Sequence, residues 1–515
     1  MPTQARALRV HSEDDVATLL SPALAAGTAV RAGETVVVTR EAIPSGHKIA
    51  LRAVPVGALL RKFGLPFGQA TVDIAPGDWV HTHNVRTALD KNETYEWTGN
   101  VRSPEFPRAK TPVTDTTFAG YLRADGQVGI RNELWVLCTV GCINRVAEEI
   151  ARRGHARLAR ANGGTVDGVY AHTHPYGCAQ IGSDLAQTRR ALAALATHPN
   201  CGGVLLFGLG CENNVLREQV DALRLADPSR LRWFNAQETE DEYEAALDAL
   251  TELAARCATD VRLPVPASKL VLGMKCGGSD GFSGLTANPL VGILADRHAA
   301  RGGVSVLTEV PEMFGAERLL MARADEETTF RAVGAMINDF KDYFRRYGEP
   351  IAENPSPGNK AGGITTLEEK SLGCVQKGGT AAPVRFVLGY GEPLRRAEGE
   401  TEGGIALAYG PGNDAVSCTT LACAGAQIVL FTTGRGTPFG TCVPTLKIST
   451  NSDLARRKPH WIDFDAGPIA ETGADPERLA DELLALTLRV ASGEETKAER
   501  NGCREIALFK DGVTE

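Results

Sequence analysis

Four cysteines stand just after apolar runs that are typical of β-strands, which is where a parallel sheet gathers its ligands. They are Cys142, Cys178, Cys211 and Cys276, each before a predicted helix or a glycine-rich turn. A helix N-terminus favours the thiolate, which is the form of cysteine that binds metal. Three thiolates with one open position suit an iron–sulfur cluster or a single soft iron ion. We therefore predict Cys142, Cys178 and Cys276 as metal ligands.

The alternative is that these thiols only pack, because a free cysteine usually behaves as a small apolar side chain. The sequence has no CxxC pair and no HExxH helix, so the standard zinc signatures are absent. We expect a packing role for the remaining eight: Cys138, Cys201, Cys257, Cys374, Cys418, Cys423, Cys442 and Cys503.

Histidines of the first 90 residues form an alternative metal site. His47 lies at the mouth of a predicted strand, and His81 and His83 stand two residues apart, so they are expected on one face of a strand. Imidazoles at this spacing can share one iron or manganese ion. The other interpretation is that they are ordinary polar residues at the rim of a small β domain.

Two polar, glycine-rich turns are candidates for binding an anion. One spans residues 354–363, and the other, residues 432–438, carries Arg435 between two glycines. Backbone amides at such turns, together with a guanidinium group, suit a carboxylate or a phosphate. The predicted substrate-binding residues are Ser279, Asp280, Asn359, Lys360 and Arg435.

A further glycine pattern resembles a dinucleotide-binding turn. Residues 410–415 fit G-x-G-x-x-A between a predicted strand and a predicted helix. The next strand, residues 427–432, ends in Thr-Gly-Arg and not in the acidic residue that binds a ribose. This disfavours a nicotinamide cofactor, and no P-loop sequence is present.

The elements that must position these residues fall into three parts. Residues 1–90 predict a small all-β domain, with short strands at 35–38, 48–54 and 79–81 between Gly and Pro turns. Residues 91–117 contain three prolines and no apolar periodicity, which predicts an extended linker. Beyond residue 117, strands and helices alternate.

This alternation predicts two α/β domains with parallel sheets, at residues 118–265 and 266–515. In the first we expect strands at 134–140, 167–172 and 203–209 and helices at 142–158, 181–196 and 213–225. In the second we expect strands at 270–274, 304–308, 405–409 and 427–432 and helices at 287–300, 326–346 and 414–424.

Composition restricts the partners. The net charge of -8 and the pI near 5.8 disfavour a nucleic-acid or anionic-membrane partner. No apolar run is long enough to span a bilayer and no secretory signal is visible, so we expect a cytoplasmic protein with reduced cysteines. Glycine, 55 of 515 residues, exceeds the average of roughly 7%. The excess lies in 268–315, 354–380 and 403–440, where backbone would approach a small ligand.

With these residues laid out, the chain resembles the altronate and galactarate dehydratase family over nearly its whole length. The segments that carry the resemblance are Gly120–Arg123, Gly129–Glu133, Cys276–Asp280, Thr286–Pro289, Asn354–Gly363 and Phe431–Pro438. Three further segments resemble the altronate branch more than the galactarate branch: His81–Asn84, Thr308–Glu317 and His460–Asp465.

The resemblance implies a β-clip (SAF) domain, a central domain used in dimerisation and a C-terminal Rossmann-like variant. It also implies dehydration of D-altronate to 2-dehydro-3-deoxy-D-gluconate with iron or manganese. A metal would stabilise the enediolate formed when the C2 proton leaves, and a general base and acid would move protons. We expect His47 and Lys48 to do this acid/base work, with Glu133 as a second candidate base.

Three other functions are alternatives. A galactarate or other sugar-acid dehydratase would keep the reaction class and change the substrate. A nicotinamide oxidoreductase would rest on Gly410 and Gly412 alone. A non-catalytic sugar-acid binding protein would use the same polar turns without turnover. In each case we expect a small-molecule ligand and a homodimer.

Overall fold

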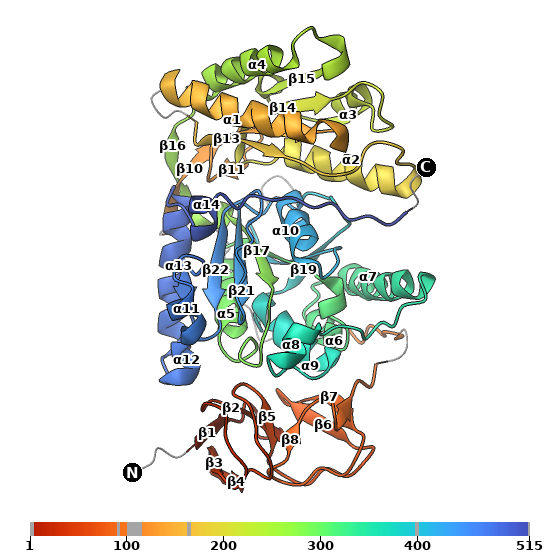
Figure 1. Cartoon of the computed structure of the whole chain (residues 1–515), viewed down its shortest axis with the longest axis vertical. Helices are drawn as coiled ribbons and strands as arrows, with labels where there is room; N and C mark the ends of the chain where they lie inside the picture. Colours follow the sequence, from red (N-terminus) through yellow and green to blue (C-terminus); the bar gives the residue numbers. More distant parts are fainter. Residues whose placement is uncertain (1–4, 90–92, 100–115, 162–165, 397–400, 513–515) are drawn as a thin grey trace.

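The computed structural model describes residues 5–89, 93–99, 116–161, 166–396 and 401–512, which form three regions along the long axis (Figure 1). A β-rich N-terminal region lies at one end and a four-stranded α/β unit at the other. The largest α/β unit lies between them. Most of the predicted linker lies outside the described residues.

The N-terminal region contains a six-stranded sheet of order β4-β3-β1-β2-β5-β8 and a three-stranded sheet of order β6-β7-β9. Its strands are β1 (Ala5–Leu8), β2 (Val16–Leu19), β3 (Ala29–Ala32), β4 (Thr35–Val38), β5 (Lys48–Ala50), β6 (Leu59–Lys62), β7 (Leu65–Ala70), β8 (Trp79–Val80) and β9 (Val85–Arg86). The predicted strand at 35–38 is confirmed, and those at 48–54 and 79–81 are shorter than expected.

The central unit is a parallel sheet of order β13-β12-β14-β15. Its elements are β12 (Glu133–Cys138), α1 (Asn144–Ala161), β13 (Gly168–His172), α2 (Gly182–Ala196), β14 (Cys201–Gly208), α3 (Leu216–Ala222), β15 (Leu231–Asn235) and α4 (Glu242–Cys257). All residues of β12 and β14 are buried, as expected for parallel strands covered on both faces. The three predicted strands are confirmed, whereas β15 and α4 were not predicted.

The largest unit is a seven-stranded parallel sheet of order β19-β20-β18-β17-β21-β22-β23. Its strands are β17 (Val271–Cys276), β18 (Val304–Leu307), β19 (Val384–Leu388), β20 (Gly404–Ala408), β21 (Ile428–Thr433), β22 (Thr445–Ser449) and β23 (Phe464–Asp465). Its helical elements include α5 (Ala287–Ala300), η5 (Val310–Glu312), α6 (Glu317–Met321), α7 (Glu327–Arg346), α8 (Pro357–Ala361), α9 (Leu367–Cys374), η6 (Val375–Gly378), α10 (Asp414–Cys423), α11 (Ser452–Arg457), α12 (Pro468–Glu471), α13 (Pro476–Ala491) and α14 (Lys497–Arg500). The predicted alternation of parallel strands and helices is confirmed.

The three regions are packed on one another. A small sheet of order β11-β10-β16, made of Val128–Gly129, Thr117–Leu122 and Arg262–Pro266, lies where the two α/β units meet. One buried apolar cluster contains Phe67, Leu206 and Leu430, one residue from each region. In the described part of the chain, no helix is long and apolar enough to cross a membrane.

Candidate functional site

Two thiols and a carboxylate meet at the carboxyl edge of the seven-stranded sheet. Cys276 ends β17, Glu312 lies in η5 after β18, and Cys374 ends α9. The Cys276 Sγ lies 3.2 Å from the Cys374 Sγ and 3.2 Å from Glu312 Oε2, which is 3.1 Å from the Cys374 Sγ. Among the residues that the structure describes, no other three His, Cys, Asp or Glu side chains bring their ligand atoms within 4.8 Å of one another. This buried donor set fits a soft divalent ion such as Fe(II).

Two buried lysines stabilise the anionic forms of this donor set. Lys377 Nζ donates to the Cys276 Sγ at 2.9 Å, and Lys370 Nζ lies 2.8 Å from Glu312 Oε1. The hydrogen bond with Cys374, helped by Lys377, holds the pKa of Cys276 below its ordinary value. The same hydrogen bond and burial raise the pKa of Cys374. Burial alone would raise the pKa of Glu312, but the surrounding lysines outweigh burial and lower it. Cys276 and Glu312 are therefore the anionic donors.

A second buried ion pair lies directly beside the donor set. Lys275 Nζ is ion-paired with Glu309 and lies 2.8 Å from Asp414 Oδ1. Glu309 adopts φ 70°, in the left-handed region that a residue with a Cβ rarely occupies. Such strain is found mainly at functional sites, where surrounding contacts impose it. Here the buried pair with Lys275 fixes the Glu309 carboxylate next to Cys276.

The N-terminal domain completes the site with two lysines. Lys48 Nζ and Lys62 Nζ lie 2.8 and 2.9 Å from the two carboxylate oxygens of Glu369, on α9. Lys48 Nζ also donates to the Gly363 carbonyl oxygen at 2.6 Å. Burial, followed by the effect of the neighbouring Lys62, outweighs the carboxylate and lowers the pKa of Lys48 to about 8. Two ammonium groups outweigh burial at Glu369 and lower its pKa to about 2.

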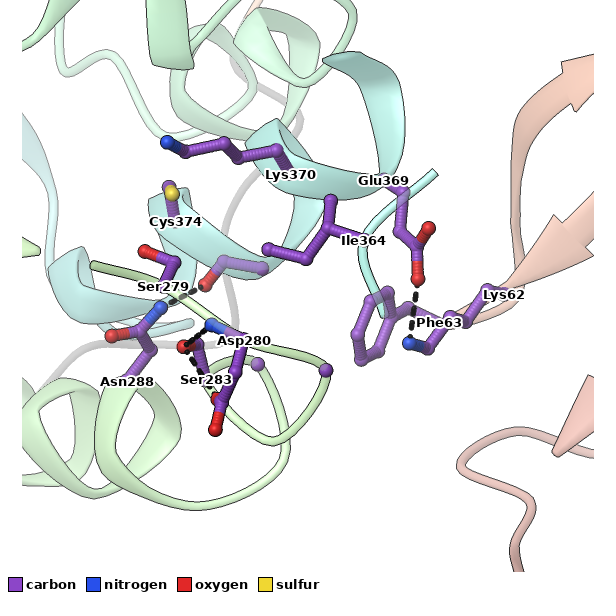
Figure 2. A pocket seen from close by; sticks show the side chains of 13 residues that line it. Lys62, Phe63, Ser279, Asp280, Ser283, Asn288, Ile364, Glu369, Lys370 and Cys374 are labelled. Atoms are coloured by element: carbon purple, nitrogen blue, oxygen red, sulfur yellow. Dashed lines mark hydrogen bonds and ion pairs between the residues drawn. The ribbon is translucent and has the colours of Figure 1, made fainter. Parts of the chain in front are cut away.

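Between the N-terminal domain and the sheet edge is a pocket lined by residues of both parts, among them Phe63 and Asp280. Figure 2 shows Lys62 reaching across from a strand of the N-terminal domain to Glu369, while Lys370 and Cys374 lie on the opposing helix. Ser279 also lines the pocket, and its buried Oγ has no hydrogen-bond partner among the described residues. The pocket thus presents ammonium groups and a free hydroxyl to an anionic, hydroxylated ligand.

Glycine lets the two domains touch at the backbone. A Cβ on Gly281 would lie 1.9 Å from the Gly46 carbonyl oxygen, and one on Gly363 would lie 2.5 Å from the same atom. Both glycines belong to the glycine-rich segments identified in the sequence. The excess of glycine there therefore serves close packing of the loops around the pocket.

The predicted substrate-binding residues gather around this pocket. Asn359 Nδ2 donates to the Ser279 carbonyl oxygen at 2.9 Å, and Arg435 Nε lies 3.8 Å from the position of a Cβ on Gly358. Lys360 is half-buried on the same short helix, α8, and Arg435 is exposed. Asp280 lines the pocket too, but its carboxylate accepts hydrogen bonds from the side chains of Ser283, Thr450 and Asn451. It therefore fixes the loop.

The predicted histidine arrangement is only partly present. His47 and His81 lie together, with ring centroids 4.9 Å apart, beside Trp79. The expectation that His81 and His83 share a face of a strand is wrong, because residues 81–84 form a turn in which the Asn84 side chain accepts from the His81 amide. His81 is buried and His83 is exposed. The three do not form a group within 4.8 Å.

His47 and Lys48, the residues expected to do acid/base work, are both buried and in contact with backbone carbonyl groups of the largest unit. Trp79 Nε1 donates to His47 Nδ1 at 3.1 Å, so His47 Nε2 is the nitrogen that faces the Ala361 carbonyl oxygen at 3.3 Å. Burial lowers the pKa of His47. Lys48 is fully buried and engaged with Glu369 and Gly363, at the junction of the two domains.

The structure does not assemble the predicted cysteine ligands. Cys276 lies in the seven-stranded unit, whereas Cys142 and Cys178 are exposed on the central unit. The three do not meet the 4.8 Å spacing. The sequence predicts these strands in two separate α/β domains, so the error lay in expecting the strand ends of the two sheets to meet. Cys374, expected to be a packing residue, is instead a partner of Cys276.

Glu133 does not reach the site. It begins β12, at the amino end of the strand, and accepts from Arg504 NH1 at 2.6 Å and Trp135 Nε1 at 2.8 Å. Burial raises its pKa although Arg504 opposes this. Glu133 therefore joins the central unit to the C-terminal segment and is not placed to act as a base in the pocket.

The dinucleotide-like turn is explained by packing. A Cβ on Gly410 would lie 2.6 Å from Thr308 Oγ1. The first free amides of helix α10 are capped by the Asn413 side chain, and Asp414 is paired with Lys275. A pyrophosphate would have to compete with these groups for the helix N-terminus.

Several residues of the site escaped the sequence analysis. They are Lys62, Lys275, Glu309, Glu312, Glu369, Lys370, Cys374 and Lys377. Glu309 and Glu312 directly follow an expected strand, so the rule that was applied to the cysteines would have found them. Cys374 gives no such signal, because its helix meets β17 only through the tertiary fold.

Comparison with known proteins agrees with this architecture. The sequence model described as "D-galactarate/Altronate dehydratase, C-terminal" matches residues 267–514, and the model of the second domain of the same enzymes matches residues 120–258. The model described as "Altronate/galactarate dehydratase SAF domain" matches residues 5–88.

Whole-length relatives give the same result. Altronate dehydratase of Escherichia coli (strain K12) is 47% identical over 507 residues, which cover 98% of this chain and 99% of that protein. Altronate dehydratase of Bacillus subtilis (strain 168) is 45% identical with the same coverage. Galactarate dehydratase (L-threo-forming) of Escherichia coli is 32% identical over 98% of this chain and 96% of that protein. The chain belongs to the altronate/galactarate dehydratase family.

Proposed function

We propose that the chain is an altronate dehydratase, a hydro-lyase that converts D-altronate to 2-dehydro-3-deoxy-D-gluconate and water. The whole-length identities of 47% and 45% to altronate dehydratases, against 32% to a galactarate dehydratase, support this substrate. The structural observation that carries the proposal is the pocket lined by Lys62, Lys370, the unpartnered Ser279 hydroxyl and Cys374, which is one member of the buried donor set.

The metal proposed is Fe(II) or Mn(II), held by Cys276, Glu312 and Cys374. Their ligand atoms already lie within reach of one ion, and the two thiols favour iron. When bound, the ion would supply Lewis-acid stabilisation of the charge that develops on the substrate.

The protein's own groups would bind the substrate and move its protons. Arg435 and Lys360 at the rim would hold the carboxylate, and Lys370 and Ser279 would contact the hydroxyl groups within the pocket. Lys48 is the candidate for proton transfer, because a pKa near 8 suits a group that must exchange a proton near neutral pH. Glu369, which contacts both Lys48 and Lys62, would hold the two ammonium groups in place.

We further propose that the chain forms a homodimer through the central unit. We also propose that the seven-stranded unit is a variant of the Rossmann fold. The twelve cysteines are all free thiols, which supports a reducing compartment such as the cytoplasm.

A comparison of sugar acids tests the substrate. The purified protein is incubated anaerobically with Fe(II) and a thiol, and formation of a 2-keto-3-deoxy acid is measured for D-altronate, D-galactarate and D-gluconate. We expect the highest kcat/KM with D-altronate. A preference for D-galactarate would overturn the proposed substrate but not the proposed dehydration reaction. No product from any of the acids would overturn both proposals.

A further inference from the structure

The three exposed strand-end cysteines lie on one edge of the central sheet. Cys142 follows β12, Cys178 follows β13 and Cys211 follows β14, and these strands are neighbours in the order β13-β12-β14. Because all three strands run parallel, their carboxyl ends meet at the same edge. Of the other nine cysteines, eight are buried and Cys503 is half-buried. The fully exposed thiols are thus the three at this edge.

Backbone contacts join the three cysteine-bearing loops into one unit. The Gly141 amide donates to the Tyr176 carbonyl oxygen at 2.8 Å, and the Asn214 amide donates to the Gly177 carbonyl oxygen at 3.1 Å. A Cβ on Gly177 would lie 2.1 Å from the Thr139 carbonyl oxygen, so the second loop rests directly on the first.

The loop that carries Cys178 is held in a strained shape. Ala179, the next residue, has φ 51°, in the left-handed region. Its amide donates to the Asn213 side chain at 2.9 Å, in the loop that also carries Cys211. These contacts fix the position of Cys178 between the other two cysteine-bearing loops.

The thiols themselves take little part in this packing. In the described part of the chain, the Sγ atoms of Cys142 and Cys178 make no hydrogen bond, and that of Cys211 only accepts a long one, 3.7 Å, from Gln237 Nε2. Three exposed thiols on rigidly connected loops are available to an external ligand. They are separate from the candidate active site, since the central sheet and the N-terminal domain lie at opposite ends of the molecule (Figure 1).

We propose that Cys142, Cys178 and Cys211 bind an iron–sulfur cluster, with one iron left without a thiolate ligand. Thiolates are the usual ligands of such clusters. A single tetrahedral ion with metal–sulfur bonds of about 2.3 Å would hold its sulfurs about 4 Å apart. The three Sγ atoms are not all within 4.8 Å of one another, which disfavours a single ion shared by all three thiols. This site does not depend on the proposed dehydratase activity.

Anaerobic reconstitution of the full-length protein with Fe(II) and sulfide tests the proposal. Bound iron, acid-labile sulfide, visible absorbance and the electron paramagnetic resonance of the reduced protein are measured after desalting. We expect the wild type to bind sulfide together with an equal amount of iron beyond the ion held at the candidate active site. C142S, C178S and C211S should each fall to background in both sulfide and the cluster spectrum. These positions are exposed, so circular dichroism should show unchanged folding.

Two control variants separate this site from other thiols. C503S removes a half-buried thiol elsewhere, and C276S removes a donor of the candidate active site. Both should retain the sulfide and the spectrum. Iron bound without sulfide, no cluster in the wild type, or a cluster that survives in the three edge variants would each overturn the proposal.

Discussion

Glu312 accepts hydrogen bonds from both thiols of the candidate metal site and pairs with Lys370. Replacing it by Gln should weaken Fe(II) binding at least about tenfold, since even residues that only orient metal ligands change affinity by that factor. An anaerobic Fe(II) titration of desalted protein checks this. E149Q, which alters a half-buried carboxylate on α1 that is paired with Arg152 and Arg153, is the control. Unchanged affinity in E312Q would move the metal away from this donor set.

Arg435 is an exposed cation beside α8, with its Nε 3.8 Å from the position of a Cβ on Gly358. Charge-assisted hydrogen bonds to a carboxylate are worth about 1.5–3 kcal/mol, so R435A should lower kcat/KM about 10- to 100-fold, mainly through KM. Steady-state kinetics with D-altronate measures the change. R457A removes an exposed arginine on α11 that is paired with Asp453, and it should keep the wild-type constants. Equal losses in both variants would argue against a specific role for Arg435.

At this scale the sequence could predict residues that follow a strand directly. Cys276, Ser279 and Arg435 were found because the carboxyl end of a strand is a local feature. Cys374 was not, because its contact with Cys276 joins positions 98 residues apart. The assignment of Cys142 to the same site as Cys276 failed because the two cysteines follow strands of separate domains, and the sequence does not show how the edges of two sheets are placed relative to each other.

At the scale of elements, the contact of β5 and β6 with α9 is the one that we expect to hold the N-terminal domain against the largest unit. Lys48 and Lys62 both pair with Glu369 there. E369Q leaves two buried ammonium groups without a counter-charge. Removing one partner of a buried ion pair costs about 3–5 kcal/mol, so the free energy of unfolding should fall by that amount. Urea denaturation followed by circular dichroism measures it. E149Q should unfold like the wild type. If E369Q also has the wild-type free energy of unfolding, Glu369 does not hold the domains together.

The same pair predicts a dependence on pH. The pKa of Glu369 falls from an ordinary value of 4.5 to about 2 in the folded protein because of Lys48 and Lys62, although burial opposes this. Between these values the unfolded chain binds more protons, so the stabilisation is complete above 4.5 and is lost as the pH falls towards 2. The difference in unfolding free energy between wild type and E369Q should therefore shrink on acidification. A difference independent of pH would show that it does not come from this charge.

Strands and helices with regular apolar patterns were the most predictable elements. The helix expected at 287–300 has the observed bounds, and β4 does as well. The strand expected at 48–54 ends at Ala50, because the chain bends away from the sheet after three paired residues. The amphipathic strand β15 was missed, since its residues are half-buried or exposed and show no continuous apolar run.

At the scale of the whole molecule, the division into a β-rich region followed by two parallel α/β units was predictable from the change of pattern near residue 118. The packing of the N-terminal domain against the largest sheet was not, because it depends on Gly46, Gly281 and Gly363 meeting at the backbone. The site exists only where these distant segments meet.

A homodimer is the expected assembly, and light scattering of the purified protein checks it. The measured mass should be twice the chain mass of 54.8 kDa and should not change across a dilution series that spans the assay concentration. A mass equal to one chain at that concentration would contradict the dimer without affecting the pocket, whose lining residues all belong to one chain.

The most direct test of the account is the rate at which D-altronate yields a 2-keto-3-deoxy acid with the wild type and with E312Q, both supplied with Fe(II). We predict steady product formation by the wild type and a loss of at least about 10-fold in folded E312Q, because even residues that only orient metal ligands change activity by about 10- to 100-fold. No product from the wild type, or wild-type turnover by E312Q, would contradict the claim that dehydration takes place between the N-terminal domain and the seven-stranded sheet.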